Sequence, residues 1–431
     1  MVNEHRWLVS IFALYFLLAV GYSLLMPIWE APDEPAHYHL AWHLARYDQY
    51  ATPKLNYEVQ QPRTYYYFGS FVIRALDKVN PELTWYSFPK ENKYNIRKPE
   101  PRFAWTGENY RFVPGVYILR WINIIFGGIA LWLNWKTFKL ITPEKATLCL
   151  GALALAALIP QYLHIMSSVN NDALGTLAGA LLFYLAMRSV KESSNPLGVV
   201  LIILALVLPL ITKLTVLPVS AAVLVIIAWK WVLRRTQKRW LLYSSLLGVF
   251  GAGIFYLLFP EIIQSAVSEI KWRLFSLRKN ALTFEYIRTI SSQIIWTYWG
   301  KVGWLAVGLP LWIIRLLTGL GLIGIALHIL SLIKSKIEHP NLKSWVTVWL
   351  IVLFTILAVF RNGLTSSATQ GRFLFPAIGA LSLLMVAGWH ETLPQRVQHY
   401  LPALIVVLFL SCNMVLWLTG ILPIYYQPFL D

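Results

Sequence analysis

The chain has few charged residues: only 13% of its 431 residues are Asp, Glu, Lys or Arg, whereas 57% are hydrophobic. A soluble globular domain has about a quarter of its residues charged. This shortage excludes a soluble protein and indicates a polytopic membrane protein. Acidic residues are especially scarce, at 20 against 37 Lys and Arg, and the net charge is +17. Because every basic segment adjoins an apolar run, we attribute this charge to membrane topology and phosphate binding and expect no nucleic-acid partner.

Cysteine is almost missing. The two cysteines, Cys149 and Cys412, both lie within apolar runs, where small buried thiols are common. They indicate neither a disulfide framework nor a metal cluster. Nucleotide-binding motifs are missing as well, since the sequence has neither a Walker A pattern nor a glycine fingerprint after a strand.

Long apolar runs, in contrast, recur along the whole sequence. Because about 17 to 25 helical residues cross the hydrocarbon core of a bilayer, these runs predict an all-α protein with about eleven transmembrane helices, within a range of ten to thirteen. The first run has no small-residue cleavage site after it and is expected to remain as an uncleaved span. Residues 296–310 form either one more span or an amphipathic segment in the membrane interface. The predicted spans are 7–28, 113–134, 146–166, 171–189, 196–212, 214–231, 240–259, 314–333, 345–360, 373–390 and 399–421.

The positions of Lys and Arg predict the orientation of these spans. With a cytoplasmic N-terminus, most basic residues of the short connections lie inside, as the positive-inside rule requires. Two long polar segments, 29–112 and 260–302, then lie outside. We expect a single integral-membrane domain, 1–431, whose first loop (29–112) is rich in Trp and Tyr and folds on the membrane surface.

Three carboxylates follow the first predicted span directly: Glu30, Asp33 and Glu34. Residues 36–47 have the pattern of a short amphipathic helix. One interpretation is therefore structural, with Asp33 as the N-cap of this helix and Glu34 in its first turn. The other is functional, because ionisable groups at a membrane edge often mark a functional site. The sequence leaves both interpretations open.

Three histidines lie in the same stretch: His37, His39 and His43. His39 and His43 are four residues apart, but Leu40 stands where a helical HExxH zinc site has its Glu, so we predict no metal site. His37 comes four residues after Asp33 and is expected to orient that carboxylate or to contact a substrate hydroxyl.

Two short polar stretches allow both a structural and a functional interpretation. Asn171 and Asp172 lie in a turn that faces outward; they suit turn and cap positions, but they also provide a second acidic group beside the first loop. Gln61-Pro62 precedes the tyrosines 65–67, which form either an interfacial aromatic belt or a surface on which a sugar stacks.

Lys213, Arg361 and Arg372 are the basic residues of the short outer connections. A lysine between two apolar runs is commonly explained by snorkelling to the interface. Three cations on one side instead favour an anionic ligand, such as a lipid phosphate at the level of the headgroups. Gln370 lies next to Arg372 and is a further candidate for substrate binding.

Taken together, these motifs resemble those of a known family. Residues 29–37, Trp-Glu-Ala-Pro-Asp-Glu-Pro-Ala-His, resemble the signature of the DUF2142 family of predicted membrane proteins, in the GT-C superfamily of lipid-dependent glycosyltransferases. The Asp-Glu pair also resembles that of protein O-mannosyltransferases and of aminoarabinose transferases of lipid A. The resemblance extends to Gln61-Pro62, to Asn171-Asp172 and to 370–376, so it covers most of the chain. Arg63-Thr64 departs from the family pattern, which commonly has a second Pro and a Leu there.

The resemblance implies a GT-C fold whose large first outer loop carries juxtamembrane helices. It implies an inverting glycosyltransferase in the cytoplasmic membrane of a prokaryote. The enzyme would move a hexosyl or pentosyl group from a polyprenyl-phosphate donor to a hydroxyl of an unknown glycan, lipid or protein at the outer face. No cofactor is required, and a divalent cation is optional because the basic residues neutralise the phosphate. In this scheme Asp33 is the general base and Glu34 positions the base or the acceptor; Glu30, His37, Asn171, Asp172 and Gln370 bind substrate; and Lys213, Arg361 and Arg372 bind the donor phosphate.

Two other functions use similar residues. A transporter or flippase of a lipid-linked saccharide would need ionisable groups along a path through the membrane, and the predicted spans hold few apart from Arg315. A ligase or polymerase that uses a diphosphate-linked glycan would also have a large outer loop, although usually a late one. The early Asp33-Glu34 pair favours the transferase.

Overall fold

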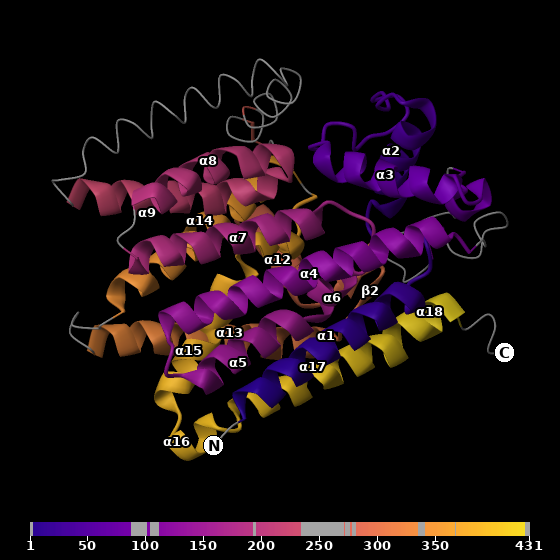
Figure 1. Ribbon diagram of the computed structural model, residues 1–431. Coiled ribbons are helices and arrows are strands. Elements are labelled where there is room, and N and C mark those ends of the chain that lie inside the picture. Colours follow the sequence, from indigo (N-terminus) through magenta and orange to yellow (C-terminus); the bar gives the residue numbers. More distant parts are fainter. Residues whose placement is uncertain are drawn as a thin grey trace.

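The computed structural model describes residues 3–87, 101–103, 112–192, 195–233, 271, 276–277, 282–334, 341–366 and 368–426. Their regular structure is almost entirely helical, and the long helices lie side by side in one bundle (Figure 1). In chain order the elements are α1 (Glu4–Leu25), α2 (Glu34–Tyr47), α3 (Thr64–Asp77), η1 (Pro81–Thr84), α4 (Pro114–Ile141), α5 (Ala146–Leu158), α6 (Pro160–Met166), α7 (Asp172–Lys191), α8 (Asn195–Ile211), η3 (Leu214–Val216), α9 (Leu217–Leu233), α12 (Phe284–Trp299), β1 (Lys301–Val302), β2 (Val307–Gly308), α13 (Leu311–Lys334), α14 (Leu342–Thr365), η5 (Gly371–Ala377), α15 (Ile378–Thr392), α16 (Gln395–Gln398), α17 (Leu401–Leu416), η6 (Trp417–Ile421) and α18 (Leu422–Tyr426).

Within the described residues, seven helices are long and apolar enough to cross a membrane, and a bent pair, α5 with α6, raises the number to eight. Two shorter apolar helices cover Gly198–Ile211 and Leu214–Lys230. The prediction of an all-α polytopic membrane protein is therefore confirmed. Every predicted span coincides with one of these helices except 240–259, which lies outside the described residues. The total of eleven stays a prediction.

Residues 296–310 do not form one more span. Helix α12 ends at Trp299, and the chain then turns through the two-stranded antiparallel hairpin β1–β2, in which Lys301 pairs with Gly308. Gly303 and Leu305 both have left-handed backbone angles, with φ of 64° and 63°. A right-handed helix cannot continue through residues with these backbone angles, so the chain turns back here.

Helix α5 lies at the centre of the bundle. Every residue from Leu148 to Leu158 is buried, and α1, α4, α15 and α17 pack against it. The helix is apolar on all its faces and consists largely of Ala, Leu and Gly, as expected for a helix surrounded by others. Pro160 then starts α6, which is bent by 60° from α5, because proline cannot continue the hydrogen-bond ladder of the preceding helix.

Helices α2 and α3 pack against each other beside the bundle, near the end of α4 that begins at Pro114 (Figure 1). Gly69 of α3 makes this packing possible, because a Cβ there would lie 2.9 Å from the Cβ of Ala41 in α2. The starts of α7 and η3, the segment η5 and the first loop meet at this same end. We call it the loop end of the bundle.

Candidate functional site

Asp33 lies on a sharply turned segment between α1 and α2. Its φ is 62° and that of Trp29 is 74°, both in the left-handed region that non-glycine residues rarely adopt. Asp33 occupies the N-cap position of α2, but its side chain makes no capping hydrogen bond. The structural interpretation of Asp33 as a capping side chain is therefore wrong, because the left-handed backbone turns the carboxylate away from the first turn of the helix.

The Asp33 carboxylate belongs instead to a cluster of four charged side chains from four separate segments. Arg372 Nη2 lies 2.9 Å from Asp33 Oδ2, and Arg372 Nη1 lies 3.5 Å from Asp172 Oδ2. Lys213 Nζ lies 2.8 Å from Asp172 Oδ1. Three of these side chains are at least nine-tenths buried, whereas the Asp33 side chain is 22% exposed. We call Asp33, Asp172, Lys213 and Arg372 the charge cluster.

Neutral polar side chains join the charge cluster to the first loop. Lys213 donates to Asn171 Oδ1 at 2.8 Å, and Asn171 donates to Gln61 Oε1 at 3.2 Å. Gln61 in turn forms a hydrogen bond with the Glu58 carboxyl group. Tyr57 completes the connection, because its hydroxyl donates to Asp33 Oδ1 at 3.1 Å. Residues 57–61 therefore contact the cluster at two points.

His37 lies on α2, one turn after Asp33. Its Nδ1 is 2.8 Å from the Tyr66 hydroxyl, and the two rings are stacked. Burial lowers the pKa of His37 to about 3, and the charge of Lys213 acts in the same direction. The imidazole is therefore neutral near pH 7.

The protonation states of the two carboxyl groups that face the cluster from the first loop differ. Burial alone would raise the pKa of Asp33, but the charge and the hydrogen bond of Arg372 outweigh it, so this pKa lies below its usual value. Burial, together with the negative charge of Asp33, raises the pKa of Glu58 to about 7. At neutral pH Asp33 is thus ionised, whereas Glu58 lies near its titration midpoint.

Several polar atoms in and next to the charge cluster make no hydrogen bond. Among the described residues, Arg372 Nε and Gln370 Oε1 are buried without a hydrogen-bond partner, and Arg372 Nη1 and Asp172 Oδ2 meet only as the ion pair at 3.5 Å, without a hydrogen bond. Buried polar atoms of this kind are uncommon in folded proteins and often face a ligand. Two guanidinium nitrogens of Arg372 are therefore able to donate to an added anion.

Glu34 does not belong to the charge cluster. Its carboxylate is fully buried and forms a bidentate pair with Arg120, at 2.8 and 2.6 Å. The backbone amides of Trp29 and Val169 donate to the same carboxylate, at 3.0 and 2.9 Å. Arg120 also donates to three carbonyl oxygens at the end of α1, those of Ser23, Met26 and Pro27. Through these contacts, Glu34 holds the backbone next to Asp33 in place.

The remaining candidates lie around this centre. Glu30 is buried and accepts hydrogen bonds from the amides of Arg102 and Phe103, so it binds another part of the first loop. Gln370 precedes η5 and lies two residues from Arg372. Arg361 lies on α14 and donates to the carbonyl oxygen of Ser276, outside the charge cluster. Within the described residues, no three His, Cys, Asp or Glu side chains form a group that suits a metal ion.

Sequence reasoning missed Arg120, Tyr57 and Glu58. Arg120 lies inside the predicted span 113–134, so the expectation that Arg315 is almost alone among charged residues of the spans was wrong. An arginine within an apolar run is a recognisable signal for a buried partner. Tyr57 and Glu58, in contrast, have no distinguishing pattern in the sequence.

Comparison with known proteins places the chain in a family. The family model of DUF2142, a predicted membrane protein, matches residues 113–380, which is more than half of the chain. The chain belongs to the DUF2142 family. The matched range holds three of the four residues of the charge cluster, and Asp33 precedes it.

No curated protein matches the sequence of this DUF2142 protein. Among solved structures, it is similar to the crystal structure of ArnT from Cupriavidus metallidurans bound to undecaprenyl phosphate. The two share 13% sequence identity with a TM-score of 0.48, and the similarity covers 98% of this chain and 75% of ArnT.

Replacing Glu34 by Gln should destabilise the protein strongly. The substitution keeps the shape of the side chain but leaves the buried charge of Arg120 without its counter-ion, and such a change costs about 3–5 kcal/mol. We expect a clear fall in the apparent unfolding temperature of the detergent-purified protein. Glu192→Gln is the matched control, since Glu192 pairs with Arg188 on the surface and exposed pairs contribute little. Equal unfolding temperatures for the two variants would contradict the structural role of Glu34.

Proposed function

We propose that this DUF2142 protein is an inverting GT-C type glycosyltransferase. It transfers a sugar from a polyprenyl-phosphate donor to an acceptor hydroxyl at the outer face of the cytoplasmic membrane. The observation that carries this proposal is the charge cluster, in which a partly exposed carboxylate lies beside two buried cations at one end of a membrane bundle. That arrangement suits a reaction that needs a base for a hydroxyl proton and cations for a phosphate leaving group.

The carboxylate and the cations of the cluster have different tasks in the reaction. Asp33 accepts the proton of the acceptor hydroxyl as its oxygen forms a bond with the anomeric carbon. The bond from that carbon to the phosphate oxygen breaks, and the electron pair leaves with the polyprenyl phosphate. Attack from the side opposite the phosphate inverts the anomeric configuration. Arg372 and Lys213 stabilise the charge that develops on the leaving phosphate.

Donor binding also activates the base. Arg372 lowers the pKa of Asp33 in the structure, and a carboxylate with a low pKa is a weak base. The phosphate of the donor adds negative charge next to Arg372 and takes up part of its hydrogen-bonding capacity, so the pKa of Asp33 rises when the donor is present. The base therefore becomes effective only when a sugar is available for transfer.

We assign the carboxylates of the first loop different tasks. Glu34 positions the base, because its pair with Arg120 fixes the backbone next to Asp33. Glu30 holds residues 102–103 of the first loop. Asn171 holds Lys213 in place, and His37 contributes a neutral imidazole beside Asp33.

Asp33→Asn should abolish transfer while leaving the fold and donor binding intact. Asparagine tolerates the left-handed backbone of this position but cannot accept the hydroxyl proton, and a general base typically contributes a factor of about 100 to 10,000 to the rate. The measurement is the release of undecaprenyl phosphate from a panel of undecaprenyl-phosphate sugars by the protein in membranes that supply the acceptor. Asp77→Asn, at the end of α3, is the control and should keep full turnover. A near-normal rate for Asp33→Asn excludes Asp33 as the base, and movement of the donor across the membrane without transfer would support a flippase.

Lys213→Ala should weaken binding of the donor. The variant removes a buried cation that contacts Asp172 at 2.8 Å, so the site becomes more negative and attracts the phosphate less. We expect the Kd for undecaprenyl-phosphate mannose, measured in nanodiscs, to rise at least tenfold. Lys54→Ala removes an exposed lysine of the first loop and should leave this Kd unchanged. If the two variants bind the donor equally, Lys213 does not contact the phosphate.

Donor binding should also weaken as the pH rises through 7. Glu58, whose pKa is raised to about 7, is neutral below this pH and adds a negative charge to the site above it. The phosphodiester of the donor carries the same single charge throughout this range. Between pH 6 and pH 8 we expect the Kd for the donor to rise about three- to tenfold. Glu58→Gln should remove this dependence, and Glu82→Gln should keep it; a pH profile that Glu58→Gln leaves unaltered would refute the assignment.

A further inference from the structure

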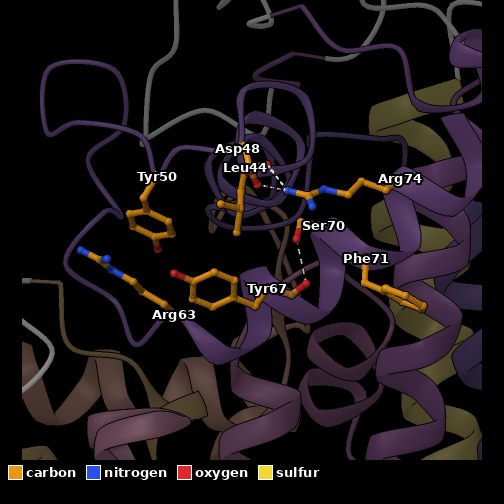
Figure 2. Close-up of a pocket in the computed structure, with 8 residues that line it drawn as sticks. All are labelled: Leu44, Asp48, Tyr50, Arg63, Tyr67, Ser70, Phe71 and Arg74. Carbon is orange, nitrogen blue, oxygen red and sulfur yellow. Dashed lines mark hydrogen bonds and ion pairs between the residues drawn. The ribbon is translucent and has the colours of Figure 1, made fainter. Parts of the chain in front are cut away.

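The first loop contains a cavity that is separate from the charge cluster. It has a volume of about 380 Å³ and lies between α2 and α3 (Figure 2). Leu44 and Phe71 form apolar parts of its wall. The polar part consists of Asp48, Tyr50, Arg63, Tyr67, Ser70 and Arg74.

The charged groups of this wall contact one another or a neighbouring ring. Arg74 lies 2.7 Å from Asp48 and also donates to the carbonyl oxygen of Leu44 at 2.9 Å. The Arg63 guanidinium lies over the Tyr50 ring, 4.5 Å from its centre. The cavity thus combines one carboxylate and two guanidinium groups with aromatic rings, and concave sites with a few convergent polar groups bind small polar ligands.

One polar group in the wall has no partner. Among the described residues, the Tyr50 hydroxyl is buried without a hydrogen bond. Figure 2 shows the hydroxyls of Tyr50 and Tyr67 pointing toward one another beside the cavity. A buried hydroxyl in a native structure normally has a hydrogen-bond partner. A ligand hydroxyl in the cavity would supply it.

These features indicate a saccharide as the ligand. A sugar ring has apolar C–H faces that pack on aromatic rings, and hydroxyls that bind paired guanidinium, carboxylate and hydroxyl groups. The volume suits a mono- or disaccharide. An anionic lipid headgroup would meet Arg63 and Arg74, but Asp48 lies 2.7 Å from Arg74 and offsets part of this positive charge.

A chain of side-chain contacts connects the wall of the cavity to the neighbourhood of Asp33. The Tyr50 ring contacts the Tyr66 ring with 6.2 Å between their centres. The Tyr66 hydroxyl lies 2.8 Å from His37, which is one helical turn from Asp33. A saccharide in the cavity is therefore separated from the neighbourhood of Asp33 by two side chains.

We propose that this cavity binds a saccharide portion of the acceptor that lies away from the reacting hydroxyl. The proposal rests on the proposed glycosyltransferase function and adds the chemical class of the acceptor. Its Tyr50 hydroxyl donates to a sugar hydroxyl, and the Tyr67 ring packs on the sugar face.

Direct binding of saccharides tests this proposal without requiring transfer. The full-length protein in nanodiscs is titrated with the methyl glycosides of mannose, glucose, galactose, N-acetylglucosamine and rhamnose and with maltose, and binding is followed by saturation-transfer NMR. At least one of these saccharides should bind saturably to the wild-type protein. Tyr50→Phe, which removes one hydroxyl and keeps the ring, should raise its Kd about five- to tenfold, and Tyr67→Ala should raise it more. Tyr47→Phe, at the last residue of α2 and outside the cavity, should leave the Kd unchanged.

The outcomes separate this inference from the proposed function. Asp33→Asn should bind the saccharide as well as the wild type, because the cavity lies apart from the base. Failure of every saccharide to bind, or binding that the Tyr50 and Tyr67 variants do not change, overturns the inference even if the enzyme transfers sugar. If the same variants instead weaken association with phosphatidylglycerol vesicles, the cavity is a lipid headgroup site and the proposal is wrong. A wild type that binds saccharide but never releases polyprenyl phosphate contradicts the transferase and leaves a saccharide-binding protein.

Discussion

The buried pair of Glu34 and Arg120 is the interaction on which the position of the candidate site depends. An unpaired charge inside an apolar bundle is very unfavourable, so neither residue is tolerated there without the other. Around this pair the structure joins the carbonyl end of α1, the start of α2, the body of α4 and the turn before α7. The left-handed segment that carries Asp33 is anchored at Glu34. Asp33 is therefore held by the helical bundle, although it lies on a loop.

Opposite charges also compensate one another at the charge cluster. Two carboxylates and two cations neutralise one another in the structure, so the buried site is stable without a ligand. The charges are balanced, but not every hydrogen bond is made: among the described residues, donors of Arg372 are left without an acceptor. An anion can bind at such a site only if the cations give up some of their contacts with the two carboxylates. Because Arg372 is paired with Asp33, an anion bound at Arg372 would raise the pKa of Asp33.

Much of this organisation could be predicted from the sequence, and the limits have physical causes. Apolar length determines whether a segment spans a membrane, so the spans were predicted closely. The predicted orientation of the spans placed Asp172, Lys213, Arg361 and Arg372 on turns at one end of the bundle, and all but Arg361 lie in the charge cluster. The direction of a side chain, however, depends on backbone angles that composition does not specify, and the capping assignment of Asp33 failed for that reason. The two carboxylates at 33 and 34 are adjacent in sequence but face different partners, which no periodic pattern reveals.

The ion pair between Asp33 and Arg372 connects residues that are 339 positions apart. During synthesis the first loop is complete long before the segment 371–377 leaves the ribosome. In that interval Asp33 has no guanidinium group beside it, and the charge cluster lacks one of its two cations. The charge cluster is therefore complete only when η5 reaches the loop end of the bundle. Any function that needs all four of its side chains can begin only after the late helices have been inserted.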